Sequence, residues 1–157
     1  MPPAFLLEPL SRDRFEALLS LRDEELVQHN ARWIRVDAKP GYPCRVSLVD
    51  AEVDERVLLV NFAHHDVSSP YRAAGPIFVR AAAQTAPLRV NEIPEMMRHR
   101  ELSIRAYDAA AMMVGAGTIH GTALEEEIER FFVNAMVDYL HIHNAGAGCY
   151  NCSVRRA

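Results

Sequence analysis

The most distinctive pattern in the chain is a series of short apolar, β-branched runs between residues 40 and 80. Residues 44–49 and 56–62 are two such runs, and the polar segment DAEVDE between them predicts two antiparallel strands joined by a loop. Residues 57–60 are apolar on both faces, so we expect the second strand to lie centrally in a sheet covered on both sides. A loop rich in turn formers follows, and residues 77–79 predict a third strand.

The N-terminal segment predicts a short strand and then a helix. Residues 5–7 are apolar and precede a proline, and Ser11 is placed to cap a helix that begins near Arg12. Apolar residues between positions 15 and 26 recur near the helical period, which indicates a helix packed on the surface of the core. Residues 33–36 predict a further short strand before a Pro-Gly turn.

The second half of the chain alternates apolar and polar residues in two neighbouring segments. Residues 102–107 predict a half-buried strand, and residues 112–119 predict its hairpin partner. Gly115 and Gly117 share one face of that partner strand, and without a Cβ they permit another backbone, a bulky side chain or a ligand to approach closely. Pro94 is suited to open a short helix just before this hairpin.

The strongest helix signal begins at Thr122, which has capping-box spacing to Glu125. The acidic run Glu125–Glu127 complements the positive end of the helix dipole, so we interpret it as a solvent-exposed face that needs no partner. Strands at 137–143 and 149–156 complete the chain. Because strands dominate and do not alternate regularly with helices, the sequence predicts a single α+β domain over residues 1–157, with a mainly antiparallel sheet and two main helices packed on it.

Composition narrows the class of protein. The chain has 157 residues, half of them apolar and a quarter charged, with a formal net charge of −4, which is poor for binding nucleic acid. No segment has the length and apolarity of a membrane span, and the N-terminus lacks a secretory pattern. Three cysteines, an odd number, indicate reduced thiols rather than a disulfide framework. We therefore expect a cytoplasmic protein without nucleic-acid or membrane partners.

The C-terminal segment HIHNAGAGCYNC holds two histidines and two cysteines within twelve residues, and these are residue types that bind zinc or iron. In a strand, however, Cys149 and Cys152 would point to opposite faces, and Cys44 supplies only a single further thiol. An enclosed metal site needs four ligands, and the alternative is a buried thiol pair near solvent-facing imidazoles. We therefore predict no bound metal and no cofactor.

Arginine, histidine and tyrosine side chains gather in two segments, the 64–80 loop and residues 141–152. Guanidinium groups bind carboxylates or phosphates bidentately, although the alternative for these arginines is a set of surface ion pairs. Adjacent His64 and His65 would point to opposite sides of an extended chain, so at most one serves a given pocket. The candidate ligand-binding residues are Arg45, His64, Tyr71, Arg72, Arg80, His141, His143, Asn144 and Cys149.

Four motifs carry a resemblance to a known family: PCRVSL, PYRAAGPIFVR, ELSIRAYD with VGAGTI, and HIHNAGAGCYNCSVRR. Over most of residues 40–155 the chain resembles the DUF1203 family, a family of small bacterial proteins of unknown function. The resemblance implies no activity, substrate or cofactor.

The function that we expect from the residues is binding of a small ligand, with anionic ligands among the candidates, in a pocket between the 64–80 loop and the 141–152 segment. Catalysis at that pocket is left open, and no catalytic residue is assigned. The alternative is a non-catalytic interaction domain, such as a homodimer, in which the same residues satisfy one another. A metal-binding protein is the third and least favoured interpretation.

Overall fold

The computed structural model describes residues 1–157 and contains eight strands and four short helices. The strands are β1 (Phe5–Glu8), β2 (Ala31–Arg35), β3 (Arg56–His65), β4 (Ala73–Arg80), β5 (Glu101–Tyr107), β6 (Met113–His120), β7 (Tyr139–Asn144) and β8 (Tyr150–Arg156). The helices are α1 (Glu16–Leu19), α2 (Asp23–Leu26), α3 (Glu95–Arg98) and α4 (Leu124–Phe132), with 3₁₀ turns at Arg12–Arg14, Val27–His29 and Gly121–Ala123. The α+β class is confirmed.

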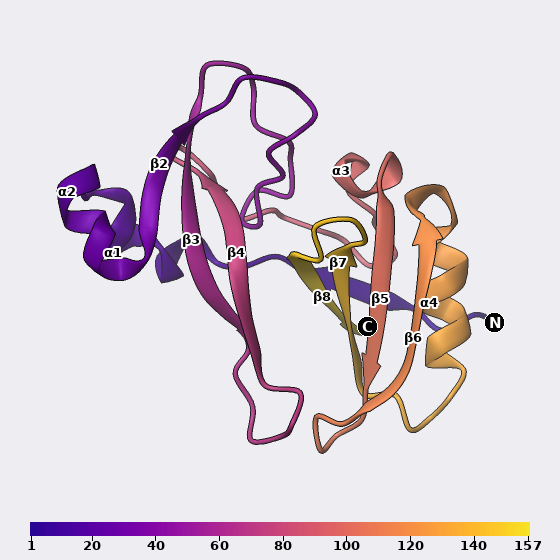
Figure 1. The fold of residues 1–157 in the computed structure, drawn as a ribbon. Helices are drawn as coiled ribbons and strands as arrows, with labels where there is room; N and C mark the ends of the chain where they lie inside the picture. Colours follow the sequence, from indigo (N-terminus) through magenta and orange to yellow (C-terminus); the bar gives the residue numbers. More distant parts are fainter.

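The strands divide between two antiparallel sheets, one of five strands in the order β1-β8-β7-β5-β6 and one of three in the order β2-β3-β4 (Figure 1). Helix α4 covers the outer face of the larger sheet, and the smaller sheet stands on the other side with α1 and α2 beyond it (Figure 1). The larger sheet therefore has a helix-covered face and a face turned toward the smaller sheet.

The helix-covered face of the larger sheet contains the main hydrophobic core. Ile104, Leu140 and Ile142 are fully buried there and belong to the same core cluster as Phe131 of α4. Burying each such side chain stabilises the fold by about 1.5–3 kcal/mol. The alternate residues of β7 lie on the other face of the sheet because side chains alternate along a strand. The expectation that Leu140 and Ile142 face the helical layer is confirmed.

Strand β3 is the central strand of the smaller sheet, as its apolar sequence predicts, and both Val57 and Leu58 are fully buried. The strand is longer than expected, because a bulge between Phe62 and His65 lets the pairing with β4 continue to His65. The loop predicted to begin near His64 is therefore confined to residues 66–72, and the two histidines belong to the strand. The core cluster of this sheet also includes Tyr150 of β8, so packing continues from one sheet to the other.

The prediction of a strand at residues 44–49 is wrong. The segment makes only isolated bridges, from Pro43 to Asp50 and from Cys44 to Phe78. It turns back on itself, since the Leu48 amide donates to the Cys44 carbonyl and Leu48 has a left-handed φ of 52°. Cys44, Val46 and Leu48 are buried by the turn rather than by strand pairing, whereas Val49 is exposed.

The N-terminal helix is shorter than predicted. Ser11 caps the 3₁₀ turn at Arg12–Arg14 by accepting a hydrogen bond from the Asp13 amide, as expected for a helix start. The helix does not continue, because α1 ends at Leu19 and a separate α2 begins at Asp23.

The expected capping box of the last helix is also wrong. His120 caps the 3₁₀ turn Gly121–Ala123 that leads into α4, and its side chain accepts from the Thr122 amide. The capping residue of α4 itself is Ala123, which forms no side-chain capping bond. The acidic run does have a partner, since Arg98 of α3 forms a two-pronged ion pair with Glu125, with Nη1 2.6 Å from Oε2. This pair ties the start of α4 to α3.

None of the helices is both long enough and apolar enough to cross a lipid bilayer.

A candidate metal centre between the two sheets

Three histidines from two sheets converge where the end of β3 meets β7. His64, His141 and His143 each offer one ring nitrogen, and these three nitrogens lie within 4.8 Å of one another. The rings of His64 and His143 meet edge to face, with centroids 5.0 Å apart. Alternation along β7 places His141 and His143 on one face, and the smaller sheet brings His64 to that face. We refer to these three residues as the histidine triad.

Hydrogen bonding leaves the triad with unpaired nitrogen atoms. His143 Nδ1 lies 2.9 Å from the Gly148 carbonyl oxygen, which can only accept, so Nδ1 carries the proton and Nε2 carries a lone pair. That Nε2 is buried without a hydrogen-bond partner, and so is Nδ1 of both His64 and His141. A buried polar atom without a partner costs about 1–3 kcal/mol, so a cluster of three calls for an explanation.

Burial keeps the triad neutral at physiological pH. Desolvation, assisted by the charges of Arg105 and of neighbouring histidines, lowers the pKa of His64 to about 4 and that of His141 to about 3. Burial also lowers the pKa of His143 to about 4, against the opposing effect of its bond to Gly148. A neutral imidazole with a free lone pair is the form that ligates a metal ion.

His65 has a different role from its neighbour. Its Nδ1 donates to the Tyr71 carbonyl oxygen at 2.7 Å, so its Nε2 accepts from the Tyr139 hydroxyl at 2.5 Å. Both ring nitrogens are thus satisfied, and His65 connects the 66–72 loop to β7. Only His64 of the adjacent pair joins the triad. Its ring stacks on Tyr150, with centroids 5.2 Å apart and an interplanar angle of 9°.

Arg45, Asn144 and Cys149 lie beside the triad. Arg45 is completely buried, and its Nε donates to the Tyr150 carbonyl oxygen at 2.7 Å while Nη1 donates to that of Pro43. Burial lowers the Arg45 pKa, and the neighbouring Cys149 opposes that shift. The Asn144 side chain donates to Cys149 Sγ at 3.4 Å. Arg45 therefore fastens the 44–49 turn to β8, directly behind the triad.

The other predicted ligand-binding residues are not brought to the triad through their side chains. Tyr71 contributes its backbone carbonyl to His65. Arg72 is exposed and lies 3.2 Å from Asp66, while Arg80 forms an ion pair of 2.9 Å with Glu55. For these two arginines the structure shows the ion-pair alternative.

Arg105 is a site residue that the sequence reasoning missed. It lies directly opposite His141 in the β5–β7 register, so the two side chains share a face of the larger sheet. The alternation in ELSIRAYD indicates a strand face, but only the strand order reveals that this face carries the histidines.

We expected no metal because the chain lacks a second pair of cysteines, but the positions of the three histidines make that argument irrelevant. That expectation counted cysteines and required two paired-ligand elements, whereas the residues that converge are imidazoles. A tetrahedral zinc ion with Zn–N bonds near 2.0–2.1 Å separates its nitrogens by about 3.4 Å. The triad nitrogens lie within 4.8 Å of one another, so they would have to approach one another by at most about 1.4 Å to reach that spacing. The donor set therefore fits a zinc-type ion.

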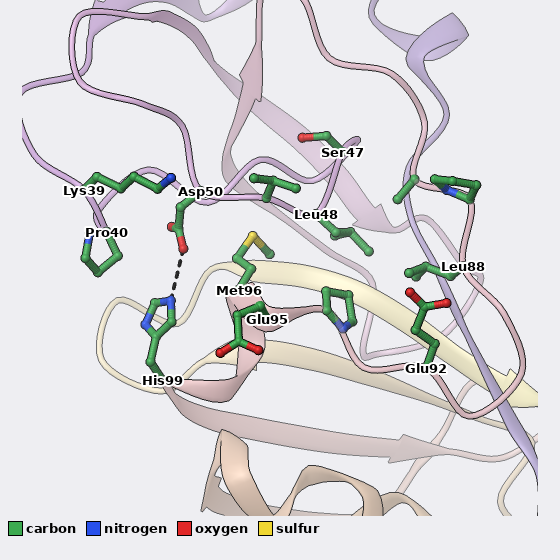
Figure 2. A pocket seen from close by; sticks show the side chains of 14 residues that line it. Lys39, Pro40, Ser47, Leu48, Asp50, Leu88, Glu92, Glu95, Met96 and His99 are labelled. Carbon is green, nitrogen blue, oxygen red and sulfur yellow. Dashed lines mark hydrogen bonds and ion pairs between the residues drawn. The ribbon is translucent and has the colours of Figure 1, made fainter.

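The largest cavity lies elsewhere, between the 39–50 and 86–99 segments (Figure 2), and has a volume of about 810 Å³. None of the triad lines it. Its most buried polar group is the Asp50 carboxylate, which pairs with Arg100 and with His99 Nε2 at 3.1 Å. Lys39 pairs with Glu52. The only lining side-chain atom that is buried without a partner is Ser47 Oγ, whereas each of the three triad residues has such an atom.

The fold and the site together define an α+β protein with a three-histidine cluster between two antiparallel sheets, in which His141 and His143 are buried and His64 is half-buried. The family model described as "Protein of unknown function (DUF1203)" matches residues 41–156, and the chain belongs to this family. No curated protein and no solved structure is similar enough to match. The matched residues include the entire triad.

Proposed function

We propose that this protein binds a divalent transition-metal ion through His64, His141 and His143, and that the bound ion receives a small ligand. The observation that carries the proposal is the state of His143. Its Nδ1–H is held by the Gly148 carbonyl, which orients the ring and leaves a buried lone pair on Nε2 directed away from that bond. Metal-binding histidines in proteins are held in this way by a second hydrogen bond.

Zinc is the ion that fits best, because it accepts neutral imidazoles in a tetrahedral arrangement and has no redox requirement. Three protein ligands leave one position for water or for a ligand molecule. When bound in such a site, the ion polarises whatever occupies that position and lowers the pKa of a bound water. The small-molecule pocket expected between the 64–80 loop and the 141–152 segment corresponds to this fourth position.

A purely structural role gives a weaker account of the cluster. Buried histidines that serve packing satisfy both ring nitrogens, as His65 does with Tyr71 and Tyr139. The triad instead carries three buried nitrogens without partners. An interaction domain gains nothing from holding such atoms together.

The proposal is tested by zinc titration of protein freed of metal with a chelator. We expect one equivalent of zinc by elemental analysis after desalting, together with a raised melting temperature, since a ligand that binds only the folded state stabilises it. His143→Ala and His141→Ala should lose the bound zinc. His29→Ala is the matched control, because His29 is exposed and far from the triad in sequence.

The outcomes separate cleanly. Wild-type protein that takes up no zinc, cobalt or nickel refutes the proposal and leaves an ordered water as the partner of the triad nitrogens. Uptake of one equivalent by both triad variants also refutes it, because the ion would then be bound elsewhere.

We further propose that the protein functions in the cytoplasm and without nucleic acid. All three cysteines are free thiols, with Cys44 and Cys152 fully buried, which supports a reducing compartment. The net charge of −4 supports the absence of a polyanionic partner.

A further inference from the structure

Arg105 is a partly buried arginine with no carboxylate partner. It forms none of the ion pairs of the protein, in contrast to Arg72, Arg80 and Arg100. Its position on β5, opposite His141, directs the side chain to the same face as the triad. The Arg105 charge is also among the causes that lower the pKa of each of the three histidines.

The charges around the triad are positive or neutral. The cluster contains no aspartate or glutamate ligand. The charges that act on His143 come from Arg105, Arg45 and His64, and no carboxylate is among them. A divalent ion on three neutral imidazoles would keep its full charge of two and would lie beside the positive charge of Arg105. An anion at the fourth position is what offsets this accumulation of charge.

The planar guanidinium group also suits a particular kind of anion. Its N–H donors form a rigid fork that matches two oxygens of one carboxylate or phosphate group. A lysine in this position would supply the charge without the fork, and a neutral residue would supply neither.

We propose that Arg105 is an anion-binding residue, and that the ligand class of this site is a small oxyanion, a carboxylate or a phosphate, that binds the metal ion through one oxygen and Arg105 through others. The inference rests on the proposed metal site. It assigns to this chain a ligand class that the three histidines alone leave open.

The experiment uses full-length protein loaded with cobalt(II), which occupies zinc-type sites and has a visible spectrum that responds to its fourth ligand. Acetate and inorganic phosphate are titrated separately into wild-type protein and into Arg105→Gln, Arg105→Lys and Arg32→Gln variants. Arg32 is the matched control, since it is an exposed arginine on β2. Cobalt content is measured for every variant before titration.

We expect one equivalent of cobalt in all four proteins and a saturable spectral change with at least one of the two anions. Arg105→Gln should weaken the binding of that anion by about tenfold or more, because a charge-assisted hydrogen bond to an anion contributes about 1.5–3 kcal/mol. The anion affinity of Arg105→Lys should lie between those of wild type and Arg105→Gln, and the affinity of Arg32→Gln should equal that of wild type. The more strongly bound anion distinguishes a carboxylate from a phosphate ligand.

Failure of this inference differs visibly from failure of the metal site. If cobalt binds and Arg105→Gln responds to anions as wild type does, or if neither anion alters the wild-type spectrum, the role of Arg105 is refuted and the metal site stands. If Arg105→Gln loses its cobalt, Arg105 is a structural residue and the inference is also refuted. If no variant binds cobalt, both proposals fail.

Discussion

Replacing Gly121 with alanine should destabilise the protein strongly. Gly121 begins the 3₁₀ turn that leads into α4, and a Cβ built there would lie 1.7 Å from the Met97 carbonyl oxygen of α3. Contacts of this kind essentially never fall below 3.0 Å, so the two backbones must separate by about 1.3 Å. The obstacle is backbone and cannot rotate away. Met97 is also fully buried, which leaves α3 little room to retreat.

The expected cost follows from two contributions. Overpacking of a dense core costs about 1–3 kcal/mol. The displacement also stretches the hydrogen bond from the Gly121 amide to the Arg100 carbonyl, 2.8 Å long, whose loss costs about 0.5–1.5 kcal/mol. Alanine restricts the unfolded chain more than glycine does, and this effect offsets the loss of stability by about 0.4–1 kcal/mol. The midpoints of these ranges combine to a fall of about 2 kcal/mol in the free energy of unfolding, and a loss of that size lowers the melting temperature by about 6 °C.

Urea denaturation of wild-type protein, Gly121→Ala and Gly75→Ala measures this difference. Gly75 lies in β4 and a Cβ there would meet no atom within 4 Å, so Gly75→Ala should be neutral or slightly stabilising. A Gly121→Ala variant less than about 1 kcal/mol below wild type would contradict the close approach of α3 to the start of α4. Equal losses in both variants would indicate a general intolerance of alanine rather than a clash.

Three further predictions concern the core and the buried polar groups. Ile142→Ala should lower the free energy of unfolding by about 2–4 kcal/mol as a truncation of a fully buried side chain, measured in urea; a loss below 1 kcal/mol would contradict its place in the core. Tyr139→Phe should cost about 1–3 kcal/mol in the same assay, because it leaves the buried His65 Nε2 without its donor, and an unchanged midpoint would show that this bond contributes nothing. Asp50→Asn should cost about 3 kcal/mol at pH 7 by leaving Arg100 unpaired. Burial raises the Asp50 pKa, but hydrogen bonds and charges from Arg100 and His99 lower it by a larger amount. The net Asp50 pKa therefore lies below its ordinary value of 3.8. A carboxylate whose pKa is lowered by folding stabilises the folded state at pH values above its ordinary pKa. This stabilisation is lost as the pH falls through the folded-state pKa. The difference between wild type and Asp50→Asn should therefore shrink below about pH 3.8, and a difference that grows on acidification would reverse this sign.

Local patterns in the sequence predicted most of the strands and the direction of their faces. The alternation of residues 137–143 assigns Ile142 to the core and His143 to the opposite face, because successive side chains of a strand point in opposite directions. The hairpin glycines were also interpreted correctly as points of close approach. A Cβ at Gly115 would lie 2.9 Å from the Phe131 ring, and one at Gly117 would lie 3.3 Å from Glu127.

Local patterns failed where burial came from distant parts of the chain. Residues 44–49 have the composition of a strand, but Cys44, Val46 and Leu48 are buried by a turn that lies against β4 and β8. The Arg45 amide donates to the Phe78 carbonyl, and its side chain donates to that of Tyr150. Composition predicts that such residues are buried, but it does not predict which elements bury them.

The candidate site shows the same division between local pattern and tertiary structure. Sequence alone determined that His141 and His143 share a face, since they are two residues apart on one strand. It could not bring His64 to them, because that contact depends on how the smaller sheet packs against β7 and β8, and packing between sheets leaves no periodic signal in either strand. The bulge in β3 and the placement of Arg105 opposite His141 are likewise tertiary facts. The donor atoms were therefore present in the sequence, while their convergence into one buried cluster was decided by the pairing of strands far apart along the chain.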